Sequence, residues 1–512
     1  MKSKAILFLL SCLLCFPVSA AAKESKETAR EWRDENIYFL MVDRFKNGDT
    51  KNDFNVNVND PKAYNGGDFR GVIQELDYIK DMGFTAIWLT PVFDNDEKGY
   101  HGYWIRDFYK TEEHFGTLDE FKQLVKEAHK RDIKIILDFV VNHTGPGHPF
   151  AADPAKKDWF HEKKPIQNWN DQEEVENNWL YDLPDFNQEN PETRKYLLDA
   201  AKWWIKETDI DGYRLDTVRH VPLDFWEEFS KEVKSQKENF YLLGEVWEND
   251  PAKISRYEKA GIDGFMDFPQ NDYLKKIFAS PDRSLTGAFL SLKRNKETFT
   301  HPELLGTFMD NHDMPRFTSD IVRNKQNPGT RWKMALSYMY TAPQIPIVYY
   351  GSEIALNGGN DPDNRRLMGF KAEKEIIDYL TKLGELRNGH KALTRGDMEV
   401  LYDKDGLAVF KRHYKDETLV VAINNSSKSQ AARIPAEKIQ KDRELRGLLG
   451  GDLVKEKGNE FSIILDREKT EVYYLGEKTG LNYPYLFTMG AVYAAFAAFI
   501  VLMVKRARKN RP

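Results

Sequence analysis

Two residues near the middle of the chain, Arg214 and Asp216, stand two positions apart in the segment DGYRLDTVRH (211–220). In an extended strand, side chains two apart point to the same side. An arginine beside a carboxylate favours its ionised form, and an ionised aspartate at the end of a strand can act as a nucleophile. A lone aspartate in this position more often caps the following helix. The nucleophile hypothesis therefore requires other polar residues that converge on the same place.

Three further apolar segments also end in polar residues: LDFVVNH (137–143), LLGEVW (242–247) and FMDNHD (308–313). Glu245 has apolar neighbours, which raise the pKa of a carboxyl group and leave it protonated as an acid. Asp313 is a third carboxylate, suited to binding sugar hydroxyls. The segments also contain neutral hydrogen-bonding groups suited to a polyhydroxylated substrate: Asn142, His143 and His312. Two carboxylates in different environments around one bond are what glycoside hydrolysis requires.

Eight β-rich apolar segments alternate with segments of helical period and must position these residues. They are 37–45, 85–92, 133–141, 212–218, 240–247, 264–268, 305–310 and 345–351. Most are continuous apolar runs, as expected for a parallel sheet that is covered on both faces. The pattern predicts an α/β fold, a (β/α)8 TIM barrel, whose chemistry lies at the C-terminal ends of its strands. The four polar clusters fall at these ends, on strands three, four, five and seven.

The barrel is predicted over residues 33–390. A capping box at Thr117 and Glu120 predicts the start of one of its helices. The connection after strand three, about 143–190, is long and has no clear period, which predicts an inserted loop domain with a function of its own. Residues 391–476 form short alternating segments and predict a C-terminal antiparallel β-sandwich domain.

Composition sets the broad class of the protein. A chain of 512 residues is too long for one compact domain, and 41% hydrophobic residues are enough to bury a large core. The net charge of −6 gives no reason to expect nucleic acid as a partner. Nothing in the sequence implies a protein partner.

Both ends of the chain carry membrane-related signals. Residues 1–22 combine two lysines, an apolar run and small residues, as a secretory signal peptide does. They include the only two cysteines, Cys12 and Cys15, so cleavage would leave none. Residues 483–504 are 22 residues without a charge, followed by a basic tail at 505–512, which predicts one transmembrane helix with the tail in the cytoplasm. We expect a single-pass cell-membrane protein with an extracytoplasmic catalytic part, either retained on the membrane or released as a soluble enzyme.

Over roughly residues 34–475 the sequence resembles the α-amylase superfamily, family 13 of the glycoside hydrolases. DFVVNH, GYRLDTVRH, GEVW and FMDNHD are similar to the four signature regions of that family, in the same order. The resemblance implies Asp216 as nucleophile, Glu245 as general acid and base, and Asp313 as transition-state stabiliser in a retaining double displacement. It also implies that three residues contact the sugar at the cleavage site: His143, Arg214 and His312.

Two further segments extend this resemblance to substrate binding. GYHGYW (99–104) implies that Tyr103 is a stacking platform under the sugar, with His101 and Trp104 as neighbours. Core packing is the alternative for Tyr103 and Trp104. GGNDPDNR (358–365) resembles a loop after strand eight in which Asp361 and Arg365 bind substrate.

Ca2+ is the ion that the resemblance implies. Its ligands would be Asn142, Glu176, Asp185 and the backbone carbonyl of His220, oxygen donors that tie the long loop to the barrel. The segments NGDTKND (47–53) and GGD (66–68) resemble a calcium loop of cyclodextrin glucanotransferases and some bacterial amylases. This resemblance implies a second calcium site with the candidate ligands Asn47, Asp49, Asn52, Asp53, Gly66 and Asp68. Solvated turns formed by these Asn and Asp side chains are the alternative for the second site.

The function predicted from the sequence is hydrolysis of α-1,4-glucosidic bonds in starch-like glucans and maltooligosaccharides. Transfer of the glycosyl group to another sugar, as in glucanotransferases that act on cyclodextrins, uses the same carboxylates and stays an alternative. A non-catalytic, membrane-anchored glycan-binding or transporter-associated subunit is a third hypothesis. The presence of all three acids argues against it, although a fold alone never fixes a function.

Overall fold

A computed structural model describes residues 30–479 and 483–509, so the predicted signal peptide lies outside the described residues. All eight predicted barrel strands are present, each shorter than its apolar segment. They are β1 (Ile37–Leu40), β2 (Ala86–Leu89), β5 (Lys134–Phe139), β6 (Gly212–Leu215), β7 (Tyr241–Gly244), β8 (Gly264–Phe265), β9 (Gly306–Thr307) and β10 (Ile345–Tyr349). The strands pair in parallel in the order β8-β7-β6-β5-β2-β1-β10-β9. A parallel bridge between Met266 and Gly306 joins the two end strands, and the predicted barrel is confirmed.

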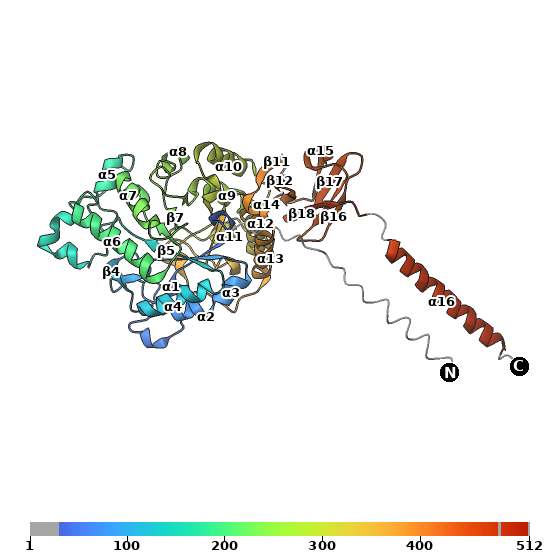
Figure 1. The fold of residues 1–512 in the computed structure, drawn as a ribbon, viewed down its shortest axis with the longest axis horizontal. Coiled ribbons are helices and arrows are strands. Elements are labelled where there is room, and N and C mark those ends of the chain that lie inside the picture. The colour runs from blue at the N-terminus through green and yellow to red at the C-terminus, as the bar shows by residue number, and fades with distance from the viewer. Residues whose placement is uncertain (1–29, 480–482, 510–512) are drawn as a thin grey trace. The chain divides into compact units, whose positions relative to one another are not determined.

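Helices surround the sheet and cover its outer face (Figure 1). The helices of the barrel are α1 (Val42–Phe45), α2 (Phe69–Gln74), α3 (Leu76–Asp81), α4 (Leu118–His129), α6 (Pro191–Thr208), α7 (Leu223–Lys234), α8 (Pro251–Ile254), α9 (Phe268–Phe278), α10 (Thr286–Thr298), α11 (Phe317–Arg323), α12 (Pro328–Thr341), α13 (Glu375–Gly389) and α14 (Lys391–Arg395). The strands are buried on both faces, which explains why they are continuous apolar runs rather than alternating ones. Helix α4 has the predicted capping box between Thr117 and Glu120.

The long connection between β5 and α6 forms the predicted insertion. It contains two short 3-10 helices, Pro149–Ala152 and Pro154–Trp159, and helix α5 (Gln172–Asn177). Its end returns to the barrel, where the Phe186 N–H donates to the carbonyl of Asn142 (2.8 Å). A bridge between His143 and Asp185 lies beside this bond, so the insertion is fixed next to the end of β5.

The sequence did not predict the hairpin of β3 (Phe93–Asn95) and β4 (Ile105–Thr111), which follows the second barrel strand. Its register shifts and the intervening 96–104 loop hide the alternation that identifies a hairpin. The Gly145 N–H donates to the carbonyl of Ile105 (2.9 Å), so the hairpin supports the start of the insertion.

The C-terminal part contains two antiparallel sheets. One has the order β11-β12-β13-β18-β15-β16 and the other pairs β14 with β17. The strands are β11 (Asp397–Lys404), β12 (Leu407–Tyr414), β13 (Glu417–Asn424), β14 (Gln430–Pro435), β15 (Arg443–Gly447), β16 (Leu453–Lys455), β17 (Glu460–Leu465) and β18 (Lys469–Glu477), with the short helix α15 (Ala436–Ile439) after β14. Side chains from both sheets form a second apolar core, as in a sandwich. The two short strands β15 and β16 were not predicted.

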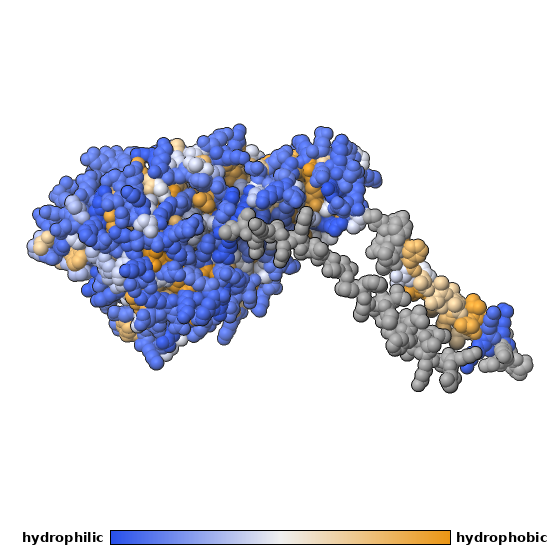
Figure 2. Space-filling model, viewed as in Figure 1, coloured by the Kyte–Doolittle hydropathy of each residue, from blue (hydrophilic) through white to orange (hydrophobic). Residues whose placement is uncertain are grey.

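Helix α16 (Tyr483–Lys509) is the last element. Within it, Leu486–Arg506 is the one segment of the described chain long and apolar enough to cross a membrane, and no part of it is buried against the protein. In Figure 2 it is coloured hydrophobic along most of its length and hydrophilic at its basic end. Length and composition therefore agree with the predicted transmembrane helix.

Candidate active site

Arg214, near the end of β6, lies at the centre of the site and is completely buried. Its Nη1 donates to Asp216 (2.6 Å) and to both carboxylate oxygens of Asp138 (2.9 and 3.0 Å). Its Nη2 lies 2.5 Å from Glu245 Oε1, a close contact without hydrogen-bond geometry. The predicted contact between Arg214 and Asp216 is present, and one guanidinium joins three carboxylates.

Asp138 is a site residue that the sequence analysis missed. It pairs in register with Arg214 across β5 and β6. It also accepts hydrogen bonds from the Tyr103 hydroxyl (2.7 Å) and the Trp88 indole (3.2 Å). Burial raises the pKa of Asp138 to about 7, although Arg214 opposes this rise. An aspartate inside an apolar strand is almost never buried without a partner, and this was the available signal.

Glu245 follows β7 directly and is 5% exposed. Its Oε2 accepts the Thr217 N–H (3.1 Å), so its carboxyl group is held beside the end of β6. Burial raises the pKa of Glu245 to about 8, with Arg214 opposing and the charges of Asp216 and Asp313 adding to the rise. The carboxyl group of Glu245 is therefore protonated at neutral pH, as its apolar neighbours predicted.

Asp313 completes the set of predicted acids. Its Oδ1 lies 3.2 Å from Arg365 Nη2 and its Oδ2 lies 3.1 Å from His312 Nε2. Its side chain is 33% exposed, whereas Asp216 and Glu245 are buried. Partial removal from water raises the pKa of Asp313, and Arg365 and Arg214 oppose that rise. Asp313 thus borders solvent, where a substrate could reach it.

The three histidines predicted to face the substrate are buried. Burial lowers the pKa of His101, His143 and His312, so all three are neutral at pH 7. The ring of Tyr103 stacks on His312, with centroids 5.0 Å apart and planes at 8°. Trp104 lies edge-to-face with His101 (4.9 Å). Tyr103 and Trp104 are half-buried, so core contacts occupy part of each ring and part stays open.

Asp361 and Arg365 lie together beside Asp313. Arg365 Nη1 is 3.1 Å from Asp361, and its Nε donates to the carbonyl of His312 (2.9 Å). The hydroxyl of Tyr100 lies 3.4 Å from Arg365 Nη1 and 3.5 Å from Asp361. Tyr100, another residue missed from the sequence, therefore contacts both predicted substrate-binding residues.

The predicted main calcium ligands lie on the insertion and on the segments that follow β5 and β6. The Oδ1 atoms of Asn142 and Asp185 are buried and have no hydrogen-bond partner. Gln172 donates to Glu176 Oε1 (2.7 Å) and to the carbonyl of Arg219 (2.8 Å). His220 Nδ1 lies 3.2 Å from the carbonyl of Val175, so α5 meets the segment after β6.

The donor set fits a hard cation, because Ca2+ takes oxygen ligands and two buried oxygens lack a partner. In the part of the chain that the structure describes, no group of three or more His, Cys, Asp or Glu side chains could hold a metal. The predicted ligands are a different kind of set, since they include an amide oxygen and a backbone carbonyl.

The candidate residues of the second calcium loop largely bond to one another or to backbone groups. Asp68 Oδ1 caps α2 through the Gly71 N–H (2.7 Å), and its Oδ2 accepts the N–H groups of Gly48 and Asp49. Further contacts join Asn47 Nδ2 to both oxygens of Asp53 (2.9 Å each) and Asn52 Nδ2 to the carbonyl of His114 (2.8 Å). A side chain at Gly66, which has a φ of +92°, would meet Asn47 and Asp53. These are the contacts of stabilised turns, and the second site stays a prediction.

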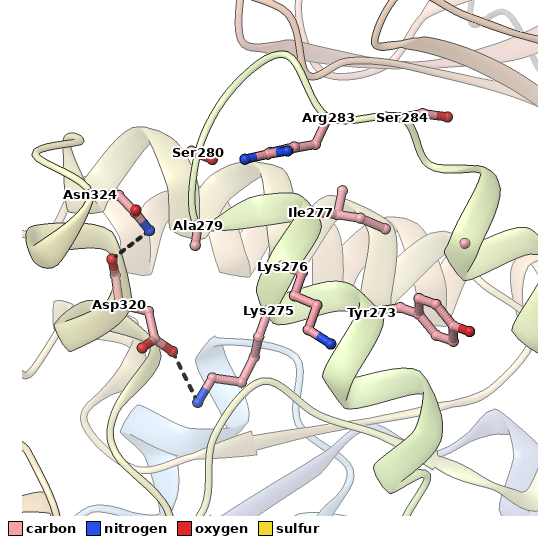
Figure 3. A pocket seen from close by; sticks show the side chains of 11 residues that line it. Tyr273, Lys275, Lys276, Ile277, Ala279, Ser280, Arg283, Ser284, Asp320 and Asn324 are labelled. Carbon is pink, nitrogen blue, oxygen red and sulfur yellow. Dashed lines mark hydrogen bonds and ion pairs between the residues drawn. The ribbon is translucent and has the colours of Figure 1, made fainter. Parts of the chain in front are cut away.

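A cavity of about 560 Å3 lies on a different part of the barrel (Figure 3). It is lined by residues of α9, α11 and the segment between α9 and α10, and Lys275 points toward Asp320 at 3.0 Å. None of the predicted site residues lines it.

The protein is a (β/α)8 barrel with buried carboxyl groups around one arginine at the C-terminal ends of its strands. This arrangement is typical of enzymes that act on glycosidic bonds. Comparison with known proteins is consistent with this class. Residues 39–436 match the family model of the α-amylase catalytic domain. An α-amylase from Anoxybacillus is 62% identical, with a TM-score of 0.88 over 88% of this chain and 100% of that one. An α-amylase from Geobacillus thermoleovorans, solved with acarbose, is 59% identical, with a TM-score of 0.86 and the same coverage.

Two curated relatives carry different activities in their names. A β/α-amylase of Paenibacillus polymyxa is 37% identical over 86% of this chain, which spans only 38% of that protein. A cyclomaltodextrin glucanotransferase of Klebsiella oxytoca is 32% identical over 82% of this chain and 74% of its own length. The chain belongs to the α-amylase family of glycoside hydrolases, and the predicted resemblance is confirmed.

Proposed function

We propose that the protein is a retaining glycoside hydrolase that cleaves α-1,4-glucosidic bonds of starch-like glucans and maltooligosaccharides. The observation that carries this proposal is the shared guanidinium of Arg214. It contacts Asp216 through one nitrogen and Glu245 through the other. Two carboxyl groups that share one guanidinium can act on the same bond, and membership of the α-amylase family supports the retaining arrangement of that pair.

Each of the three acids then has a defined part in the reaction. Asp216, ion-paired to Arg214, attacks the anomeric carbon while Glu245 gives its proton to the departing glycosidic oxygen. The bond between that carbon and oxygen breaks, and a covalent glycosyl-enzyme forms. Glu245, now ionised, takes a proton from water, whose oxygen attacks the same carbon and releases Asp216. Asp313 and the neutral His312 would hold sugar hydroxyls as the ring distorts.

Calcium would be held by Asn142, Asp185, Glu176 and the carbonyl of His220. The unpartnered oxygens of Asn142 and Asp185 support this ligand set. The ion would supply positive charge that joins the insertion to the barrel, so its role is structural. It takes no part in the proton transfers.

Transglycosylation is the second candidate, supported by the similarity to the cyclomaltodextrin glucanotransferase. Only the acceptor differs, because a sugar hydroxyl would replace water in the second step. A chromatographic product profile on starch, maltooligosaccharides, pullulan and cyclodextrin separates the two. Short linear products support hydrolysis, and cyclic or elongated products support transfer.

Helix α16 supports attachment to a membrane. Its apolar length and its basic end agree with one span and a cytoplasmic tail, which would leave the barrel on the other side. Release of a soluble enzyme by cleavage before α16 is compatible with the same arrangement.

Reducing-end release from soluble starch tests the proposed function. Asp216→Asn should lower kcat/KM by at least about 1,000-fold, because it removes the nucleophile. Asp209→Asn is the matched control, since Asp209 is exposed and holds a left-handed backbone that Asn also adopts. Inactive wild-type protein, or an Asp216→Asn variant with wild-type rates, would refute the proposal.

A further inference from the structure

A continuous set of buried contacts connects the loop before α2 to Asp313. It begins at Arg44 in α1, which is 1% exposed. Arg44 Nη2 donates to the carbonyls of Pro61 and Ala63 (2.9 Å each), and Nη1 donates to the side chain of Asn65. Its Nε lies 3.0 Å from Asp43. Arg44 therefore fixes the shape of the loop.

The same guanidinium has a second contact. Its central carbon lies 3.9 Å from the centre of the Tyr100 ring. A desolvated cation at this distance attracts the face of an aromatic ring and fixes its position. Tyr100 is 4% exposed, and its hydroxyl reaches Arg365 (3.4 Å) and Asp361 (3.5 Å). Arg365 in turn lies 3.2 Å from Asp313.

Two functions of Arg44 can be distinguished on these contacts. If Arg44 only stabilises the loop, its contact with Tyr100 is incidental, and the losses of activity caused by changing Arg44 and Tyr100 are independent of each other. If the contact matters, the ring and hydroxyl of Tyr100 hold Arg365, and Arg365 holds Asp313. The second case is favoured because Tyr100 is buried between two arginines, with the Arg44 cation on its face and Arg365 at its hydroxyl.

We propose that Arg44 and Tyr100 are positioning residues for the reaction, which orient Arg365, Asp361 and Asp313 around the sugar without touching the reacting atoms. The inference rests on the proposed glycoside hydrolysis. It implies that the loop before α2 affects turnover through the side-chain contacts of Arg44 and Tyr100.

The experiment measures kcat and KM on a maltooligosaccharide of defined length for full-length variants. Tyr100→Phe removes only the hydroxyl and should lower kcat/KM about fivefold to tenfold, with Tm unchanged. Arg44→Met keeps the side-chain length and should lower it by about tenfold to a hundredfold. Because both act through one chain of contacts, the double variant should be within about twofold of Arg44→Met. Arg194→Met is the matched control, since Arg194 also lies over an aromatic ring, Phe225, outside the site, and it should keep wild-type kinetics.

Two results would overturn the proposal while wild-type protein is active. One is a Tyr100→Phe variant whose kcat and KM both stay within about twofold of wild type. The other is a double variant whose loss equals the product of the two single losses. If Arg44→Met fails to fold, Tyr100→Phe can still overturn the proposal by the first of these results. An inactive wild-type protein would instead refute the hydrolase function on which the inference rests.

Discussion

At the residue scale, the charges of the buried carboxyl groups must be balanced by the arginine that they share. One buried guanidinium contacts three carboxyl groups: Asp138, Asp216 and Glu245. One cation cannot compensate three buried anions, so at least one group keeps a proton. Glu245 is that group because the pKa of its carboxyl is raised to about 8. The same cation thus contacts the predicted nucleophile, Asp216, and a second carboxyl group whose raised pKa suits the predicted acid, Glu245.

The pH profile should report the proton on Glu245. Because the acid must be protonated in the free enzyme, kcat/KM should fall as pH rises through about 8. Glu245→Gln should lower kcat/KM by about 100-fold to 10,000-fold and abolish that alkaline limb. Glu248→Gln is the control, because Glu248 lies three residues further along the chain and pairs with Arg219 and Lys253 rather than with Arg214. An alkaline limb that persists in Glu245→Gln would contradict the assignment.

Asp138→Asn tests the buried support of Arg214. The substitution keeps the shape of the side chain but removes a charge beside a buried cation. It should lower the free energy of unfolding by about 3 kcal/mol, and kcat/KM should fall with it. Denaturant unfolding and steady-state kinetics measure the two effects. Wild-type values of both would show that Arg214 does not depend on the Asp138 carboxyl group and would contradict this prediction.

The sequence predicts the acids and the histidines of the site more completely than their supporting residues. Asp216, Glu245 and Asp313 each close an apolar segment in a recognisable cluster. Asp138 was missed because it lies inside the apolar run and its partner comes from the neighbouring strand. Tyr100 was missed because its contacts come from residues far away in the chain.

At the element scale, the C-terminal ends of the barrel strands position most of the candidate site residues. The eight barrel strands were predictable because each is a continuous apolar run, and a parallel sheet covered on both faces requires such runs. The hairpin β3–β4 and strands β15 and β16 were not, since their residues form no clear apolar pattern and the strands depend on tertiary pairing. Helix α16 was predictable from length and composition alone.

The insertion between β5 and α6 should depend on calcium. A chelator should lower the Tm of the wild-type protein, and added Ca2+ should restore it, because binding to the folded state alone stabilises that state. Asp185→Asn should reduce this difference in Tm, whereas Asp182→Asn, with an 84% exposed side chain, should not. A Tm that is the same for protein loaded with Ca2+ and for chelator-treated protein, the latter shown to be metal-free by elemental analysis, would contradict the proposed site.

At the scale of the whole molecule, the catalytic part and the apolar helix should be separable. A chain that ends at Glu477 lacks α16 and should move from the membrane fraction to the soluble fraction. Its kcat/KM on a soluble maltooligosaccharide should stay within about twofold of the full chain, because no site residue lies beyond β18. A full-length protein that is already soluble after carbonate washing, with α16 intact, would contradict the anchor.

The central claim is cleavage of an α-1,4 bond with retention through Asp216 and Glu245. Proton NMR of a maltooligosaccharide digest, recorded before mutarotation, tests it most directly. The new reducing ends should appear first as the α-anomer, because two displacements restore the configuration. Initial appearance of the β-anomer would show a single displacement and contradict the nucleophilic role of Asp216.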